Sequence, residues 1–322
     1  MATDDKQASP LDQTKAWKLL EDIALAGLKE QRRARRWGIF FKLLTFIYLL
    51  VLVLLMLPTL PKAGFSGPHT ALVELKGQIA DDKPASADHL VAGLREAFAD
   101  QQAKAVLLRI NSPGGSPVQS GYVYDEIKRL RSLHPDKKLY AVITDLGASG
   151  AYYVASAADQ IYADKASLVG SIGVTAASFG FVGAMEKLGI DRRVYTAGEH
   201  KAFLDPFQPP KADETQFWQQ VLDITHRQFI NSVKAGRGDR LKVAEHPELF
   251  TGLVLSGEQA LELGLIDGLG SASYVAREKI GAEKFVDYTV KESPLDRFSK
   301  RLGAELAERL AIWTGFGGPQ LR

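Results

Sequence analysis

One long apolar run near the N-terminus constrains this chain more than any other feature. Residues 38–57 read GIFFKLLTFIYLLVLVLLML and carry a single charge, Lys42, close to the start of the run. About 20 apolar residues are what a helix needs to cross the hydrocarbon core of a bilayer. We therefore expect a transmembrane helix over residues 37–58, followed by a much longer C-terminal part.

The charges that flank this run predict its orientation. Positive charge is concentrated before it, at Lys29, Arg32, Arg33, Arg35 and Arg36, whereas the nearest one after it is Lys62. Because Lys and Arg accumulate on the cytoplasmic side, residues 1–36 are expected in the cytoplasm and everything after about residue 60 outside it. The alternative, a cleaved signal peptide, normally has a shorter apolar run with an A-x-A site directly after it, and no such site directly follows this run.

Bulk composition excludes several classes of protein. The 322 residues include 40 basic and 38 acidic side chains, so the net charge of +2 gives no reason to expect nucleic-acid binding. Cysteine is absent, which excludes disulfides and a thiolate nucleophile. The six histidines have no metal-ligand spacing such as HExxH, and we expect no metal and no cofactor.

Apolar strands and helices alternate after a linker at residues 59–68. Strands are expected at residues 71–79, 103–110, 139–144 and 160–163, and helices at 88–100, 122–133, 149–158, 212–236 and 256–267. Buried strands separated by helices predict an α/β fold with a largely parallel sheet. This domain is expected over residues 69–292, with a C-terminal helical tail at residues 293–322.

Ser149 is a candidate nucleophile. It lies in Gly147-Ala148-Ser149-Gly150-Ala151, at the start of a helix of small residues and at the end of a predicted strand. Open α/β sheets place their sites at such strand ends, and a helix N-terminus favours developing negative charge. Taken alone, this serine could equally be an ordinary helix cap worth about 1 kcal/mol.

A pair of glycines could supply the donors that stabilise an oxyanion. Gly114 and Gly115 follow another buried strand, in Asn111-Ser112-Pro113-Gly114-Gly115-Ser116. Paired glycines let backbone N–H groups turn toward a ligand, and the N–H of Gly150 could complete the set. The alternative is an ordinary Pro-Gly turn.

Lys201 is the candidate general base. A lysine amine acts as a base only where apolar surroundings lower its pKa, and Phe203, Leu204 and Phe207 could supply that setting. His200 is a rival base, and neighbours in an extended segment point in opposite directions, so one of the two should face the site. Ser171, in a glycine-spaced segment, could orient the lysine; a bulge or tight bend is the alternative.

The order of these segments resembles peptidase family S49, a family of membrane-anchored serine–lysine signal peptide peptidases. The resemblance covers about residues 68–292. It rests on RINSPGGSP at 109–117, DLGASGAYYVASAADQIYA at 145–163, SLVGSIGV at 167–174, AGEHKAF at 197–203 and TGLVLSGEQALELGLIDGLG at 251–270.

The resemblance implies roles for single residues. Ser149 would be the nucleophile, Lys201 the base and Ser171 the residue that holds the lysine. The implied fold is the ClpP/crotonase type, a superhelix of repeated ββα turns. The sequence departs from the family before Thr251-Gly252, where Glu248-Leu249-Phe250 stands without a preceding Gly-Arg. That departure concerns local packing.

The resemblance also implies an activity and an assembly. We expect a single-pass protein of the bacterial inner membrane that cleaves signal peptide remnants or other extended apolar polypeptides outside the cytoplasm. One chain supplies one repeat, so a ring-like homo-oligomer is implied, with Ser149 of one subunit meeting Lys201 of another. Two alternatives share the fold: a crotonase-like acyl-CoA enzyme and a non-catalytic membrane scaffold.

Overall fold

The computed structural model describes residues 10–56, 67–242, 244 and 246–291. The chain divides into two units, one containing the N-terminal helix and the other spanning Phe65–Glu292. The expected tail at residues 293–322 and most of the expected linker at 59–68 lie outside the described residues.

In the described part of the first unit, one long helix, α1 (Pro10–Met56), continues through the expected cytoplasmic segment and the apolar run. Within it, Glu21–Val53 is long and apolar enough to cross a membrane, and none of its most apolar window is buried against other parts of the chain. Length and composition therefore agree with the expected membrane span.

The second unit is built on a mixed but mostly parallel sheet. The main path runs in the order β6 (Val254–Ser256), β5 (Leu168–Gly170), β3 (Leu139–Ala148), β2 (Ala103–Ser112), β1 (His69–Lys76) and β8 (Phe285–Asp287). All pairs on this path are parallel except β5 with β6. The expected α/β class is confirmed.

Strand β3 is paired in two successive halves along one edge. Its first half, Tyr140–Ile143, pairs with β4 (Gln160–Ala163), and its last three residues, Leu146–Ala148, pair with β5. β4 in turn pairs with β7 (Gly268–Leu269). The sheet therefore divides at the middle of β3, and the chain segments after β3 and β5 are brought to the same place.

Both faces of the central strands are buried, which explains their nearly continuous apolar sequences. In β2, Val106, Leu108 and Ile110 belong to the larger core, and Ala105 and Leu107 belong to a smaller core on the opposite face. The larger core is covered by helices α2 (Ala87–Ala99), α3 (Pro117–Leu133), α4 (Gly150–Ala155) and α6 (Ala212–Arg237). The smaller core is closed by Val275 from the π-helical turn η3 (Val275–Ile280).

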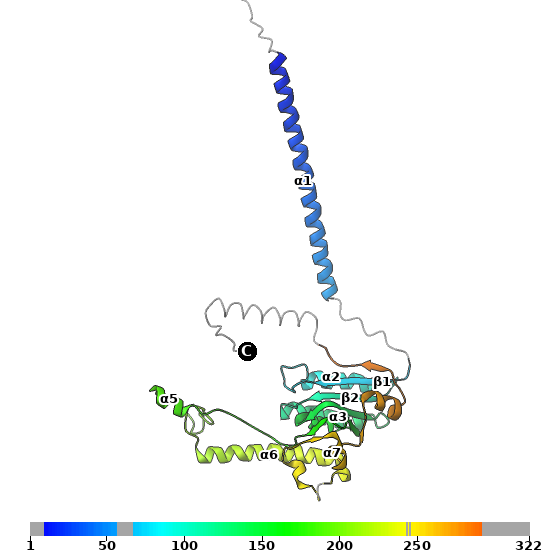
Figure 1. The fold of residues 1–322 in the computed structure, drawn as a ribbon, viewed down its shortest axis with the longest axis vertical. Coiled ribbons are helices and arrows are strands. Elements are labelled where there is room, and N and C mark those ends of the chain that lie inside the picture. The colour runs from blue at the N-terminus through cyan, green and yellow to red at the C-terminus, as the bar shows by residue number, and fades with distance from the viewer. Residues whose placement is uncertain (1–9, 57–66, 243, 245, 292–322) are drawn as a thin grey trace, which may run out of the picture. The chain divides into compact units, whose positions relative to one another are not determined.

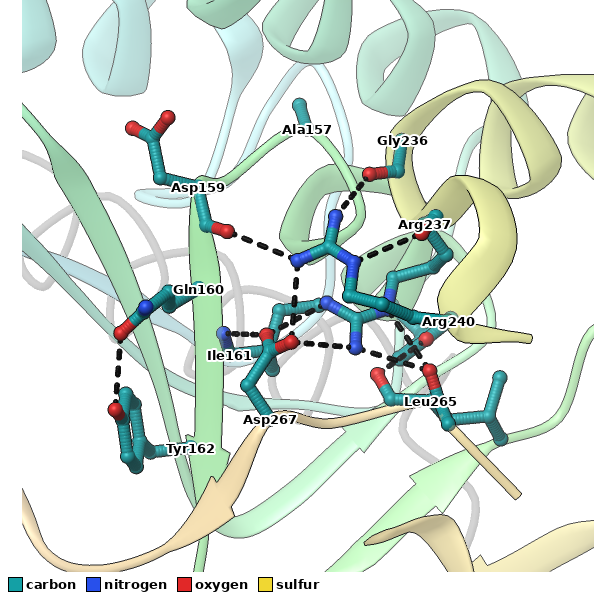
Figure 2. A network of polar contacts seen from close by, with 12 residues as sticks. Ala157, Asp159, Gln160, Ile161, Tyr162, Gly236, Arg237, Arg240, Leu265 and Asp267 are labelled. Carbon is teal, nitrogen blue, oxygen red and sulfur yellow. Dashed lines mark hydrogen bonds and ion pairs between the residues drawn. The ribbon is translucent and has the colours of Figure 1, made fainter.

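A buried ion pair ties the end of α6 to the segment that follows the short helix α7 (Gly257–Glu262) (Figure 2). The fully buried Arg237 guanidinium donates to both carboxylate oxygens of Asp267, at 2.7 and 3.0 Å, and to the carbonyl of Gly264. Arg240 also reaches Asp267, at 3.1 Å. Burial alone would raise the pKa of Asp267, but the hydrogen bonds and charge of Arg237, together with the Ile161 N–H and the Arg240 charge, outweigh it and lower that pKa.

Residues 171–211 form an arm that returns to the domain through α6 (Figure 1). The arm contains the short helix α5 (Val182–Leu188) and a local cluster in which Phe181 stacks on Phe207, with ring centroids 5.2 Å apart. Several of its large apolar side chains are exposed: Phe179, Phe181, Leu188, Ile190, Val194, Tyr195, Leu204 and Phe207.

Candidate active site

The register of the parallel strands brings three sequence segments together. Ser112 of β2 pairs with Gly147 of β3, and Ala148 of β3 pairs with Gly170 of β5. The residues that follow these pairs are therefore neighbours at the carboxyl end of the sheet. The two loops expected to carry a site lie there, and Ser171 joins them because it directly follows Gly170.

Ser149 has an unusual backbone conformation. It caps α4 with φ of 53° and ψ of −126°, a region that normally admits glycine, and its side chain makes no capping hydrogen bond. Its N–H donates to the carbonyl of Gly170 at 2.8 Å, and its carbonyl accepts from the N–H of Tyr153 at 3.0 Å. The hydroxyl of Ser149 therefore does not serve as an ordinary helix cap. The backbone of Ser149 is nevertheless fixed by hydrogen bonds of both its N–H and its carbonyl group.

Ser171 shares this backbone feature. Among the described residues, positive φ in a residue other than glycine occurs at Ser149, Ser171 and Leu204. The N–H of Ser171 donates to the carbonyl of Leu253 at 2.8 Å, and its carbonyl accepts from Gly173 at 2.9 Å. Strained residues persist only where the surrounding structure holds them, and they are concentrated at functional sites.

The Gly114-Gly115 loop packs directly on the Ser149 turn. A Cβ atom added at Gly114 would lie 2.5 Å from the nitrogen of Gly150 and 2.9 Å from the Cβ of Ser149. A Cβ atom added at Gly115 would lie 2.1 Å from the carbonyl oxygen of Ile79. Both glycines have positive φ, so this close approach requires them in two independent ways.

The three N–H groups expected to bind an oxyanion differ in whether they already donate to an acceptor within the chain. The N–H of Gly114 donates to Ser112 Oγ at 3.1 Å and is therefore already engaged. The N–H groups of Gly115 and Gly150 have no acceptor among the described residues. A Cβ atom added at Gly150 would lie 3.2 Å from the nitrogen of Gly115, which shows how close these two residues are.

Ser149 and Ser171 line the same cavity, which has a volume of about 990 Å³ and lies entirely within the second unit. Gly115 and Gly150 line it as well. Its other walls come mainly from α3, α6 and the loops at residues 173–175 and 251–252. A hydroxyl, two unengaged N–H donors and space for an extended chain are therefore present together.

Lys201 does not line this cavity. It lies in the arm with an exposed side chain, as does the rival base His200, whose Nδ1 lies 3.2 Å from Glu214 Oε1. The two residues were expected in an extended segment, but the structure has consecutive turns there. The N–H of Lys201 donates to Gly198 and that of Phe203 donates to His200. Within a single chain, therefore, Ser149 and Ser171 line the same cavity, and Lys201 lies outside it.

The structure adds His226 and Tyr153 to the residues near the site. His226 Nε2 lies 3.0 Å from the carbonyl oxygen of Ile172, so this nitrogen must carry the proton and donate to the strained turn. Tyr153 stacks on Phe229 at 4.9 Å and lines the cavity. In the sequence, the four-residue spacing between Ser149 and Tyr153 is the one feature that could have indicated Tyr153. No motif around His226 indicates that it lies near the site.

The chain is similar to peptidases over much of its length. Residues 131–284 match the model of peptidase family S49. A protein of Enterococcus faecium named as a candidate signal peptide peptidase SppA is 29% identical over 260 residues, 78% of this chain and 74% of the relative. Protease 4 of Haemophilus influenzae is 31% identical over 270 residues, 77% of this chain and 42% of the relative.

A further relative is named as an ion transporter and not as a peptidase. The Na(+)/H(+) antiporter NhaA of Brucella melitensis is 47% identical over 188 residues, which are 58% of this chain and 25% of that protein. The chain thus spans about a quarter of the length of this relative. Because the match covers only a quarter of the antiporter, it gives no reason to expect ion transport by this chain.

Proposed function

We propose that this chain is a serine endopeptidase whose nucleophile is Ser149, because residues 131–284 match the model of peptidase family S49. The observation that carries the proposal is the strained conformation of Ser149 beside the unengaged N–H groups of Gly115 and Gly150. Two such donors suit an oxyanion that develops when the hydroxyl attacks a carbonyl. Gly114 then supports the donors through the packing of its loop, because its own N–H is engaged by Ser112.

Lys201 of a neighbouring subunit is proposed as the base. Within one chain this lysine is exposed and outside the cavity, whereas an arm with exposed apolar side chains offers a surface for a second copy. In this homo-oligomer, Ser171 would hold the lysine amine near Ser149. The division of the sheet at β3 supports the proposed ClpP/crotonase-type superhelix of repeated ββα turns.

The proposed chemistry is acyl transfer through a serine ester. The neutral lysine amine takes the proton of Ser149 as its Oγ bonds to the carbonyl carbon, and the oxyanion is held by Gly115 and Gly150. When the C–N bond breaks, the lysine returns the proton to the leaving amine. Water then attacks the ester while the same lysine takes its proton, and this proton returns to Ser149 as the acid product leaves.

Location and substrate follow from the N-terminal helix and the family. We propose a single-pass protein of the bacterial inner membrane, with residues 1–36 cytoplasmic and the peptidase domain on the extracytoplasmic side. Substrates would be signal peptide remnants or other extended apolar polypeptides. The match to a peptidase family favours this function over the acyl-CoA enzyme and the scaffold.

Mixed assemblies test the nucleophile, the base and the sharing of sites together. Full-length Ser149→Ala and Lys201→Ala chains with different affinity tags are co-expressed, purified through both tags in detergent, and assayed with internally quenched apolar peptides. Each variant alone should be inactive. If each site takes its serine and lysine from two chains, random mixing should restore about a quarter of the wild-type rate, because that fraction of interfaces carries both intact residues.

The controls separate the parts of this proposal. His200→Ala should retain activity, since its side chain is not needed as the base. Inactive mixtures of two correctly assembled variants would indicate a dyad within one chain. Cleavage by Ser149→Ala, or no cleavage of any peptide by the wild type, would overturn the assignment of a serine peptidase.

A further inference from the structure

The candidate active-site cavity contains one charged side chain. Among the described residues that line it, Asp125 alone is charged at neutral pH, and the others are apolar, glycine, hydroxyl or amide residues. The Asp125 carboxylate has no ion-pair or hydrogen-bond partner in the described part of the chain. A carboxylate without a counter-ion in an uncharged cleft attracts a cationic group of whatever occupies that cleft.

The neighbouring carboxylate shows the contrast. Glu126 lies next to Asp125 in α3 but faces away from the cavity, where Arg95 and Arg129 bind it at 2.6 and 2.7 Å. Lys128, one turn beyond Asp125, does not line the cavity and makes no ion pair in the described residues. No basic side chain of the described residues therefore lines the cleft to neutralise Asp125.

Helix α3 sets the distance of Asp125 from the chemistry. Pro117, Gly121 and Asp125 line the cavity at four-residue intervals and thus lie along one face of the helix. Pro117 is close to the oxyanion donor Gly115 in the chain, and Asp125 lies eight residues further, which is about 12 Å along a helix axis. An extended peptide covers that distance in roughly three to four residues.

We propose that Asp125 is a specificity residue that selects peptides with a positive charge, a Lys or Arg side chain or a free α-amino group, about three to four residues from the cleaved bond. This inference rests on the proposed peptidase function and names a feature of its substrates. The apolar surfaces of Val118, Tyr122 and Phe229 accept the intervening uncharged segment. The preferred substrate is thus an extended apolar segment bordered by a cation.

The size of the effect follows from the exposure of the carboxylate. Asp125 is exposed in the single chain, so the attraction is modest and screened by salt. We expect about a three- to tenfold preference for the cationic peptide at low ionic strength, falling as the screening length shrinks below about 10 Å.

Matched peptides test this inference. Full-length protein in detergent is given internally quenched apolar peptides in which one position at a time, from four residues before to four after the cleaved bond, carries Lys, norleucine or Glu. Norleucine retains most of the lysine stem and removes the charge. The wild type should show the highest kcat/KM with Lys, and the lowest with Glu, at one or two positions distant from the bond.

Two variants show where the preference originates. Asp125→Asn should bring the Lys-to-norleucine ratio of kcat/KM close to one, a ratio that cancels any change in overall rate. Lys128→Gln, which removes a nearby charge outside the cavity, should keep or increase the ratio. A wild-type ratio of one at every position, or an unchanged ratio in Asp125→Asn, overturns the inference while the peptidase function stands. If neither Lys nor norleucine peptides are cleaved, the proposed function fails and the inference fails with it.

Discussion

The backbone N–H of Ser149 donates a 2.8 Å hydrogen bond to the carbonyl of Gly170, the residue directly before Ser171. Ala148 and Gly170 are partners in the parallel β3–β5 pair, so the bond continues that pairing by one residue beyond the strand end. Both serines then turn into positive φ, at 53° and 51°. The two serines are thereby positioned by the same local element.

Relief of the strain at Ser149 should be measurable as stability. Glycine adopts the Ser149 conformation freely, whereas alanine retains a strain of about 1–3 kcal/mol. Glycine loses about 0.5–1 kcal/mol through its greater freedom in the unfolded chain. We therefore expect Ser149→Gly to be more stable than Ser149→Ala by about 1 kcal/mol, a difference of roughly 2–4 °C in Tm for a domain of this size.

Ser156 provides the matched control for this comparison. It lies at the other end of α4 with ordinary helical φ of −63°. There the order should reverse, with Ser156→Ala more stable than Ser156→Gly. If alanine were also the better residue at position 149, the strain would not be a property of the protein in solution.

His226 should act as a positioning residue for the Ser171 turn. Its Nε2–H donates to the Ile172 carbonyl at 3.0 Å from a different element, helix α6. His226→Phe keeps a ring but removes the donor, and we expect kcat to fall about tenfold with little change in KM, because a mispositioned group affects the transition state. His226→Gln, which restores an N–H donor, should recover part of the loss. Equal kcat values for the Phe and Gln variants would argue against positioning through this hydrogen bond.

Glu126 should make stability depend on pH in the acid range. Its hydrogen bonds with Arg129, followed by those with Arg95, outweigh burial and lower its pKa to about 2. A carboxyl whose pKa is depressed in the folded state stabilises the protein above its unfolded pKa, near 4.3, and loses this contribution as pH falls toward the folded value. Glu126→Gln should therefore lower Tm by a few degrees at pH 7, and the difference should vanish between about pH 5 and pH 2.

The contribution of Glu126 is limited by solvent. Arg95 and Arg129 are 59% and 50% exposed, so we expect roughly 1 kcal/mol, discounted for screening. Melting curves of wild type and variant across that pH range measure it. Asp136→Asn, at an exposed carboxyl with no ion pair in the described residues, is the control and should show no such convergence. A constant difference at all pH values would show that Glu126 contributes by packing and not by charge.

Removal of Arg237 should destabilise the domain far more than removal of a surface arginine. Its side chain is fully buried against Asp267, which also accepts from the N–H of Ile161 at 2.7 Å. Arg237→Leu leaves a mostly buried carboxylate with Arg240 as its one remaining cation, and we expect a loss of about 3 kcal/mol or more in the free energy of unfolding. Combining it with Asp267→Asn should recover part of that loss, because the uncompensated charge is gone. Arg277→Leu, at an exposed pair, should cost little.

Much of the architecture could be predicted from local patterns. Nearly continuous apolar strands such as residues 103–110 and 139–144 appear as β2 and β3, each extended beyond the predicted end into a loop that carries candidate site residues. Local patterns did not indicate the turns around Lys201, because four-residue turns depend on few residues and weak preferences. Local patterns also could not show that the N–H of Gly114 is engaged while that of Gly115 is not. This difference depends on the hydrogen bond from Gly114 to the side chain of Ser112.

The sequence by itself determined the long apolar helix, the alternation of strands and helices, and the identity of Ser149, Ser171 and the paired glycines as candidates. These features depend on composition and spacing along the chain. Only the tertiary structure decided that Ala148 pairs with Gly170, that His226 reaches the Ser171 turn, and that Asp125 faces the cavity while Glu126 is neutralised outside it. The reason is physical: strand register and helix packing bring distant segments together, and the side of a helix on which a carboxylate lies determines whether it faces the cavity or an arginine.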